Sequence, residues 1–175
     1  MELSSNLKGR IGRYKVIDRL AIGGMAEVLL ALDELGAGAQ RTVVVKKMLP
    51  HLAEDEQLVQ MFTQEAKIAR GISHPNVVRI HKLGKQNGYP YLVMEHVQGC
   101  TFRPLIRAVT RRNVPFPIGV ALQLAIQAAA GAHAAHEYIN PWGTPQEVVH
   151  RDLTPHNLMV TAEGIVKVVD FGIAK

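Results

Sequence analysis

Three β-type runs near the N-terminus are the feature that most restricts the fold of this 175-residue chain. They cover residues 14–20, 28–32 and 41–48, and each is rich in aliphatic or β-branched side chains. Short, turn-rich segments separate the runs, and the first of these segments contains Gly23 and Gly24. Strands with such connections form hairpins, so we expect an antiparallel meander.

The next segment extends this sheet and adds one helix. Residues 54–70 repeat their apolar side chains with helical spacing. Two further β-type runs follow at residues 77–83 and 91–95, and we expect residues 84–90 to form the loop between them. The first half of the chain is therefore predicted to be a small antiparallel sheet with one helix.

After residue 98 the pattern changes to helices and one short hairpin. Helices are predicted over residues 102–111 and 118–138, and the paired strands over residues 158–161 and 165–169. We therefore divide the chain into a polar tail (1–13), a sheet-rich part that ends in a hinge (14–97) and a helical part (98–175).

Composition excludes several classes of protein. The 47% of hydrophobic residues is too high for a disordered chain, and one cysteine, Cys100, cannot form an internal disulfide. A lone cysteine fits a reducing cytoplasm, and the first 20 residues contain no secretory signal. The apolar stretch 118–135 is Ala-rich and is interrupted by Gln123, Gln127 and His133, which favours a buried helix over a membrane span.

The net charge of +5 permits a polyanionic partner without requiring one. The densest basic group is Arg107, Arg111 and Arg112, and no aromatic side chains that could stack on bases are interleaved with it. We expect a solvated face and no nucleic-acid partner.

Two features of the first half could bind a nucleotide, and each has a simpler alternative. Gly23 and Gly24 would let backbone N–H groups approach a phosphate, but a plain hairpin turn has the same composition. Glu65 lies on the apolar stripe of its helix, where a carboxylate needs a cation such as Lys46. The alternative is an ordinary helix glutamate that is solvated or paired with a neighbouring basic residue.

Two polar groups of the second half bracket the predicted hairpin. The segment His150-Arg151-Asp152-Leu153-Thr154-Pro155-His156-Asn157 precedes it, and Asp170-Phe171-Gly172 follows it. Asp152 could accept a proton. Because the two ends of a hairpin are neighbours, we expect Asn157 and Asp170 to lie side by side as oxygen ligands for one Mg²⁺.

In this order the motifs resemble the signature set of the protein kinases of the eukaryotic-like, bacterial branch. They are Ala21-Ile22-Gly23-Gly24-Met25-Ala26-Glu27-Val28, Val43-Val44-Val45-Lys46, residues 150–157, and Asp170-Phe171-Gly172. The resemblance implies an α+β, two-lobed protein-kinase-like fold. It would comprise the complete N-lobe, an antiparallel sheet plus one helix, and the first part of the helical C-lobe.

The resemblance also implies ATP- and Mg²⁺-dependent phosphoryl transfer to Ser or Thr of a protein substrate. Asp152 would be the catalytic base, Lys46 would hold the α- and β-phosphates, and Glu65 would fix Lys46. Asn157 and Asp170 would bind the metal. The implied nucleotide contacts are Leu20, Ala21, Ile22, Gly23, Gly24, Met25, Ala26, Val28, Val44, Lys46, Met94, Glu95, Val97 and Met159.

Three departures from the family pattern leave alternatives open. Ala21 and Ala26 replace the outer glycines of the loop, and Thr154 replaces the usual lysine. The chain also stops just after Asp170-Phe171-Gly172, so we expect either a fragment of a longer kinase or a truncated relic, in either case without turnover by itself. The rival function is an ATP-binding pseudokinase or regulatory module. A small-molecule phosphotransferase is disfavoured because Phe171 follows Asp170.

We expect the partners to be ATP and a protein substrate in the cytoplasm. Only one face of the apolar helix 118–138 can pack on the rest of this chain. A second copy of the chain, or a C-terminal remainder, is expected to cover the other faces.

Overall fold

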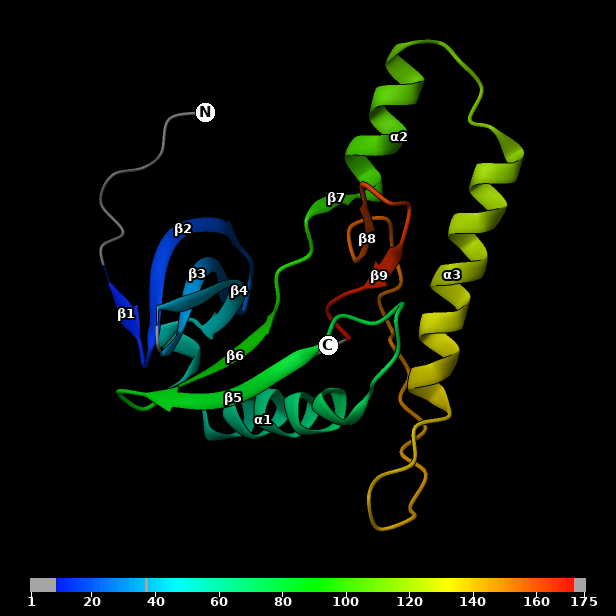
Figure 1. Ribbon diagram of the computed structural model, residues 1–175. Coiled ribbons are helices and arrows are strands. Elements are labelled where there is room, and N and C mark those ends of the chain that lie inside the picture. The colour runs from blue at the N-terminus through cyan, green and yellow to red at the C-terminus, as the bar shows by residue number, and fades with distance from the viewer. Residues whose placement is uncertain (1–8, 37, 172–175) are drawn as a thin grey trace. The chain divides into compact units, whose positions relative to one another are not determined.

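The computed structural model describes residues 9–36 and 38–171, apart from the side chain of Glu65. The chain forms two compact units (Figure 1). The described part of unit 1 runs to Lys67 and includes Ile80–His96, and that of unit 2 comprises Ile68–Arg79 and the chain from Val97 to Phe171.

Unit 1 is an antiparallel sheet with the strand order β1-β2-β3-β4-β6-β5. The meander predicted from the sequence is present as the hairpins β2–β3 and β3–β4. The strands are β1 (Arg10–Ile11), β2 (Tyr14–Ile22), β3 (Ala26–Gly36), β4 (Ala39–Met48), β5 (Ile80–Gln86) and β6 (Tyr89–Glu95). A 3₁₀ turn, η1 (Pro50–Leu52), follows β4.

One helix, α1 (Glu56–Gly71), separates β4 from β5 in the sequence. It begins two residues later than predicted because Asp55 caps it. The Asp55 carboxylate accepts the backbone N–H groups of Gln57 and Leu58, at 2.8 and 3.3 Å. These two bonds satisfy N–H groups of the first helical turn, which have no acceptor within the helix.

Alternation along the strands builds the core of unit 1 on one face of the sheet. Side chains at every second position of β4, Val43 and Val45, are fully buried in a cluster with residues of the neighbouring strands. Tyr14 and Tyr91 meet edge-to-face in this cluster, with ring centroids 6.4 Å apart.

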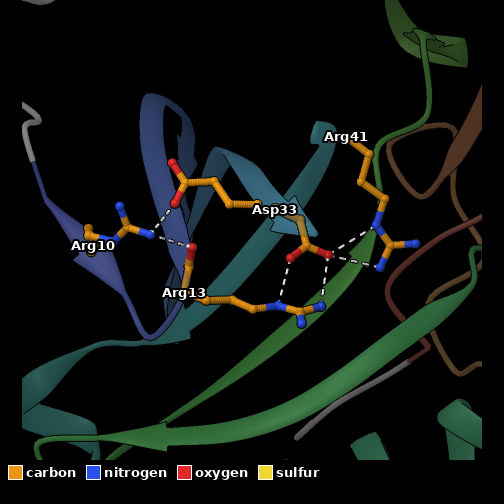
Figure 2. A network of polar contacts seen from close by, with 5 residues as sticks. Arg10, Arg13, Asp33 and Arg41 are labelled. Carbon is orange, nitrogen blue, oxygen red and sulfur yellow. Dashed lines mark hydrogen bonds and ion pairs between the residues drawn. The ribbon is translucent and has the colours of Figure 1, made fainter. Parts of the chain in front are cut away.

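A buried carboxylate in β3 contacts two arginines, one directly before β2 and one in β4 (Figure 2). Asp33 of β3 is fully buried, and its Oδ2 accepts from Arg41 Nε at 3.0 Å and from Arg13 at 3.1 Å. Asp33 Oδ1 lies 2.7 Å from Arg13 Nε, an ion pair without the alignment of a hydrogen bond. Arg10 pairs with Glu34 beside this group. Charge pairing therefore compensates the burial of Asp33.

Unit 2 contains a three-stranded antiparallel sheet, β7-β8-β9, and two helices. The elements are β7 (Gly99–Thr101), α2 (Phe102–Arg111), α3 (Ile118–His136), β8 (Leu158–Thr161) and β9 (Val166–Val168). The bounds of α2 and β8 are those predicted. The core combines the buried stripe of α3 with Leu158, Val166, Val168 and Phe171.

Polar contacts tie α3 to the hairpin β8–β9. Gln127 Oε1 accepts from the Asn76 side chain at 3.1 Å and from Val166 N at 3.0 Å, and Gln127 Nε2 donates to Gly164 O at 3.0 Å. At Gly131 a Cβ atom would lie 2.5 Å from Asn76 O, so only glycine permits this approach. These contacts are those of a helix packed within a protein domain.

Much of α3 nevertheless stays exposed, as predicted. Its buried residues form one stripe, Leu124, Ala128, Gly131 and Ala135, whereas Ile118 is 78% and Ile126 is 61% exposed. By length and hydropathy alone, α3 could cross a membrane, with 22% of the relevant window buried. That criterion is weak for a single helix, because core helices also meet it.

The main differences from the sequence-based expectation lie at strand pairings. Residues 84–90 were expected to be a loop, but they belong to β5 and β6, joined by a tight turn at Asn87-Gly88 with positive φ at both residues. Asn-Gly favours this turn in hairpins. Val77, expected in a strand of the first sheet, instead forms a parallel bridge to Val168 in unit 2. Strands β1 and β7 were not expected.

Candidate functional site

In unit 1, four residues predicted to bind a nucleotide lie on one face of the sheet. Val28 of β3 pairs with Lys46 of β4, and Val44 of β4 pairs with Met94 of β6. Paired residues share a face, and so do residues two apart in one strand. This face is opposite to that of Val43 and Val45, and on it Val44 and Met94 are buried whereas Val28 and Lys46 are half-buried.

Glu95, the last residue of β6, lies on the opposite face of the sheet. It pairs with Val43, so strand alternation puts its side chain on the other face from Val44 and Met94. The predicted contact of Glu95 with the nucleotide stays a prediction. Met94 is buried and Glu95 is half-buried.

The Gly-rich segment is the tight turn between β2 and β3. Gly23 N donates to Ala26 O at 2.9 Å, and Met25 O accepts from Leu49 N at 3.0 Å. Neither Gly23 nor Gly24 has a positive φ, and no heavy atom lies within 4 Å of a Cβ built at Gly24. The fold therefore does not require glycine here, whereas close approach of a ligand would.

The other residues predicted for this loop are mostly solvent-facing. Leu20 is 50% and Ile22 is 59% exposed, and Ala21 pairs with Val28. The pairing of β2 with β3 shifts register between Arg19 and Ala21, which leaves Leu20 without a pairing partner. Ala26 is buried at the start of β3, where its methyl group is part of the packing.

Lys46 is half-buried near the C-terminal end of β4, between Val28 and Leu92 of the neighbouring strands. Glu65 belongs to α1, but its side chain lies outside the described residues. The expected pairing of these two residues thus stays a prediction.

In unit 2, the segment 150–157 folds so that its polar side chains hold one another. Asn157 Nδ2 donates to the backbone O of Asp152 at 2.9 Å and to its carboxylate Oδ2 at 3.0 Å. The backbone N of Asn157 donates to Thr154 O at 2.9 Å, which closes the turn. The Asp152 carboxylate, half-buried, is therefore held in one orientation by a neighbour five residues away.

His150 supports the same loop from the core. It is 6% exposed, its Nδ1 accepts from Asp152 N at 3.3 Å, and its Nε2 lies 3.0 Å from Val169 O. An accepting Nδ1 puts the proton on Nε2, which then donates to Val169 O. The ring also packs on Phe171, with centroids 4.8 Å apart. His150 thus connects the Asp152 loop to the strand that leads to Asp170.

The hairpin β8–β9 brings the end of the 150–157 loop next to the residue that precedes Asp170. Leu158 pairs with Val168, and Val169 N donates to Asn157 O at 3.0 Å, directly before Asp170. Asp170 and Arg151 both have positive φ, 55° and 61°, in a region that non-glycine residues rarely adopt. Such backbone strain concentrates at functional sites and suggests a constraint on where these side chains point.

The oxygen atoms present suit Mg²⁺. Asn157 uses its amide nitrogen toward Asp152, which leaves Oδ1 as an acceptor. Asp170 is half-buried and directly follows Val169, whose N–H donates to Asn157 O. Within residues 9–36 and 38–171, no three His, Cys, Asp or Glu side chains form a group that could hold a metal ion by themselves. A carboxylate and an amide fit a hard cation whose other ligands are phosphate and water.

The remaining predicted contacts belong to unit 2. Met159 of β8 pairs with Thr101 and Lys167 and is half-buried, and Val97 is 7% exposed. Sequence reasoning gave no role to His150 or to Arg103, which contacts His156 of the 150–157 loop at 2.7 Å. Both are parts of spatial contacts that no periodicity reveals.

An antiparallel sheet with a lysine on one face, and a polar loop whose aspartate is oriented by an asparagine, are features of phosphoryl-transfer proteins. The sequence pattern of the protein kinase domain family matches residues 14–175, and the chain belongs to that family. The two-lobed, kinase-like fold class predicted from the sequence is thereby confirmed.

The relatives are bacterial. The chain is 47% identical to the tyrosine-protein kinase MasK of Myxococcus xanthus over 165 residues, which are 94% of this chain and 25% of that protein. It is 36% identical to the serine/threonine-protein kinase PrkC of Bacillus subtilis, over 93% of this chain and 23% of the relative. The chain spans about a quarter of the length of these relatives.

A solved structure shows the same fold. The kinase domain of PknI from Mycobacterium tuberculosis matches with a TM-score of 0.71 and 25% identity, over 96% of this chain and 63% of that domain. The kinase resemblance stated from the motifs is therefore supported by sequence and by structure.

Proposed function

We propose that this chain is the nucleotide-binding and catalytic part of a protein kinase that transfers the γ-phosphoryl group of ATP to Ser or Thr of a protein substrate. The observation that carries the proposal is the double hydrogen bond from Asn157 to Asp152, which orients the one carboxylate of the 150–157 loop. Residues 14–97 would be the N-lobe with its hinge, and residues 98–175 the first part of the C-lobe.

The N-lobe residues would bind the nucleotide. The backbone at Gly23 and Gly24 would lie nearest the phosphates, Lys46 would neutralise the α- and β-phosphates, and Glu65 would fix Lys46. Adenine would be sandwiched by apolar side chains and recognised by hinge backbone groups. The residues assigned to this contact are Val28, Val44, Met94, Glu95, Val97 and Met159.

The C-lobe residues would perform the transfer. Asp152 would orient the substrate hydroxyl and accept its proton as the oxygen attacks the γ-phosphorus. Asn157 and Asp170 would hold Mg²⁺, which, when bound, neutralises charge on the transferred phosphoryl group. His150 would keep the Asp152 loop in register with Asp170 through its bond to Val169 O. Catalysis would thus consist of positioning and charge neutralisation.

Two observations favour second candidates. The relative with 47% identity is named a tyrosine-protein kinase, so the acceptor hydroxyl could belong to Tyr. Thr154 stands where Ser/Thr kinases usually carry a lysine, which favours an ATP-binding module without turnover. Phosphoamino-acid analysis of the product decides the first question, and transfer by the unmodified protein decides the second.

We also propose where the protein acts and what covers its exposed helix. ATP, Mg²⁺ and a lone exposed thiol, Cys100, are compatible with the cytoplasm. The exposed apolar residues of α3, such as Ile118 and Ile126, would be covered by more of the kinase domain or by a second copy of the chain.

The test is transfer of radiolabelled phosphate from ATP by the full protein with Mg²⁺. Asp152→Asn is expected to lower the rate at least about a hundredfold, because it removes the proton acceptor. The matched control is Glu54→Gln, which neutralises an exposed carboxylate before α1 and should leave transfer unchanged. Full activity of Asp152→Asn would refute the assignment.

A further inference from the structure

The surface of α2 carries a regular row of arginines. Arg103, Arg107 and Arg111 follow one another at intervals of four residues, which puts them on one side of the helix. All three are exposed. Phe102 and Leu105 of the same helix pack against the core of unit 2, so the arginine row faces away from that core. We call these three residues the basic face of α2.

No ion pair compensates this positive charge in the described part of unit 2. From Glu95 to Glu137 the sequence contains no intervening Asp or Glu. Within the described parts of the chain, none of the ion pairs involves an arginine of the basic face. In contrast, three arginines of unit 1, Arg10, Arg13 and Arg41, pair with carboxylates. A row of guanidinium groups without ion pairs attracts anions.

Direct contacts connect the basic face to the candidate catalytic loop. Arg103 donates from Nη1 to His156 Nε2 at 2.7 Å, and its backbone N donates to Pro155 O at 3.2 Å. His156 immediately precedes Asn157, which holds the Asp152 carboxylate. Since all these residues belong to unit 2, the row begins at the loop that would receive the substrate hydroxyl.

We infer that the basic face of α2 binds an acidic segment of the protein substrate beside the residue that is phosphorylated. The inference rests on the proposed kinase function and names its substrate class. Successive arginines of the row are about 6 Å apart along the helix axis. Every second residue of an extended peptide is about 6.6 Å apart. The best substrate segment therefore carries Asp or Glu at alternate positions.

The experiment measures binding of fluorescent peptides to this chain by anisotropy at low salt, with Mg²⁺ and ATP present. Each peptide has one Ser. In the first pair, three Asp alternate with Ala, either before or after the Ser. The second pair has Asn in place of Asp, and the third has the three Asp in succession. The full protein is then assayed for transfer to the same peptides.

The test variant is Arg107→Glu/Arg111→Glu, which leaves the contact between Arg103 and His156 in place. The matched control is Lys82→Glu/Lys85→Glu on β5, which makes the same change in charge at two exposed positions of unit 1. We expect the unmodified chain to prefer one alternating Asp peptide over its Asn counterpart by about tenfold, or about 1.4 kcal/mol. The preference should disappear in the test variant and persist in the control.

Equal binding of Asp and Asn peptides, or equal losses in the two variants, would overturn the inference. So would a preference for the peptide with successive Asp. Tighter binding of a single-stranded oligonucleotide, lost in the same test variant, would assign the face to nucleic acid instead. Peptide preference with no phosphoryl transfer would refute the proposed kinase activity while leaving the acidic-segment site supported.

Discussion

Asn157 holds Asp152 by its amide nitrogen, 3.0 Å from the carboxylate oxygen Oδ2, while its own amide oxygen is left for another ligand. One side chain thus has two separable tasks. The nitrogen orients the candidate base, and the oxygen is available to a metal ion. The two tasks can be distinguished because aspartate keeps the oxygen and loses the donor.

Asn157→Asp is therefore expected to retain Mg²⁺ binding while losing transfer. The substitution puts a second carboxylate where the amide now donates to Asp152, so the two groups repel. We expect the maximal rate to fall about a hundredfold. The Mg²⁺ concentration at half-maximal rate should stay the same or decrease. Asn157→Ala, which removes both atoms, should raise that Mg²⁺ concentration, and identical behaviour of the two variants would contradict the separation.

Gly24→Ala should weaken ATP binding without changing the stability of the fold. A Cβ at this position meets no atom of the chain within 4 Å, and φ is not positive. A methyl group would instead occupy the space proposed for the phosphates. We expect the dissociation constant for ATP, measured by calorimetry, to rise several-fold while the urea midpoint stays unchanged. A fall in the midpoint with unaltered ATP affinity would show that this glycine serves the turn alone.

Gly131→Ala provides the contrasting case of a glycine that the fold requires. The added Cβ would lie 2.5 Å from Asn76 O and 2.9 Å from a Val168 methyl group, both of which are fixed by strand and bridge contacts. Neither neighbour is a flexible side-chain end, so α3 must shift away from the hairpin. We expect a loss of about 1–3 kcal/mol in the free energy of unfolding, measured in urea. The exposed Gly119→Ala on the same helix, with open space around it, is the control.

Where local pattern decided the structure, the sequence predicted it. The strands of the meander, helix α2 and the hairpin β8–β9 follow from periodicity and turn residues that lie within each segment. The adjacency of Asn157 to the strand before Asp170 followed from that hairpin, and the backbone bond from Val169 to Asn157 agrees with it. The metal role of the two side chains remains a prediction.

Features that depend on contacts between distant segments could not be predicted from the sequence. Strand β7 has little β-type pattern of its own and forms because Gly99 can approach Val160 O, where a Cβ would lie at 2.1 Å. The contact of Arg103 with His156 joins residues 53 positions apart. The burial of Asp33 depends on Arg41, which follows it in β4, and on Arg13, which directly precedes β2. The Asn87-Gly88 turn was predictable from its composition, and interpreting residues 84–90 as a loop was an error of pattern reading.

Asp33→Asn should destabilise unit 1 although it preserves the shape of the side chain. The substitution removes the charge that pairs with Arg13, which directly precedes β2, and with Arg41 of β4 (Figure 2). The arginines are about half exposed and can regain water, which limits the penalty. We expect the free energy of unfolding to fall by about 1–3 kcal/mol. Glu34→Gln, which breaks only the exposed pair with Arg10, should leave the urea midpoint within error.

Tyr91 should make the fold sensitive to alkali. Burial raises the pKa of its hydroxyl above the usual value near 10, and the proximity of Tyr14 adds to the effect, while Arg13 opposes it. Below pH 10 the hydroxyl is neutral in the folded and the unfolded chain, so stability does not depend on it. Above pH 10 the unfolded chain loses the proton first, and the free energy of unfolding falls until the pH passes the folded pKa. The slope contributed by one such group is at most about 1.4 kcal/mol per pH unit.

Urea midpoints at pH 9, 10 and 11 should therefore fall less steeply for Tyr91→Phe than for the unmodified chain. Equal slopes would show that Tyr91 ionises as readily in the folded chain as in the unfolded one.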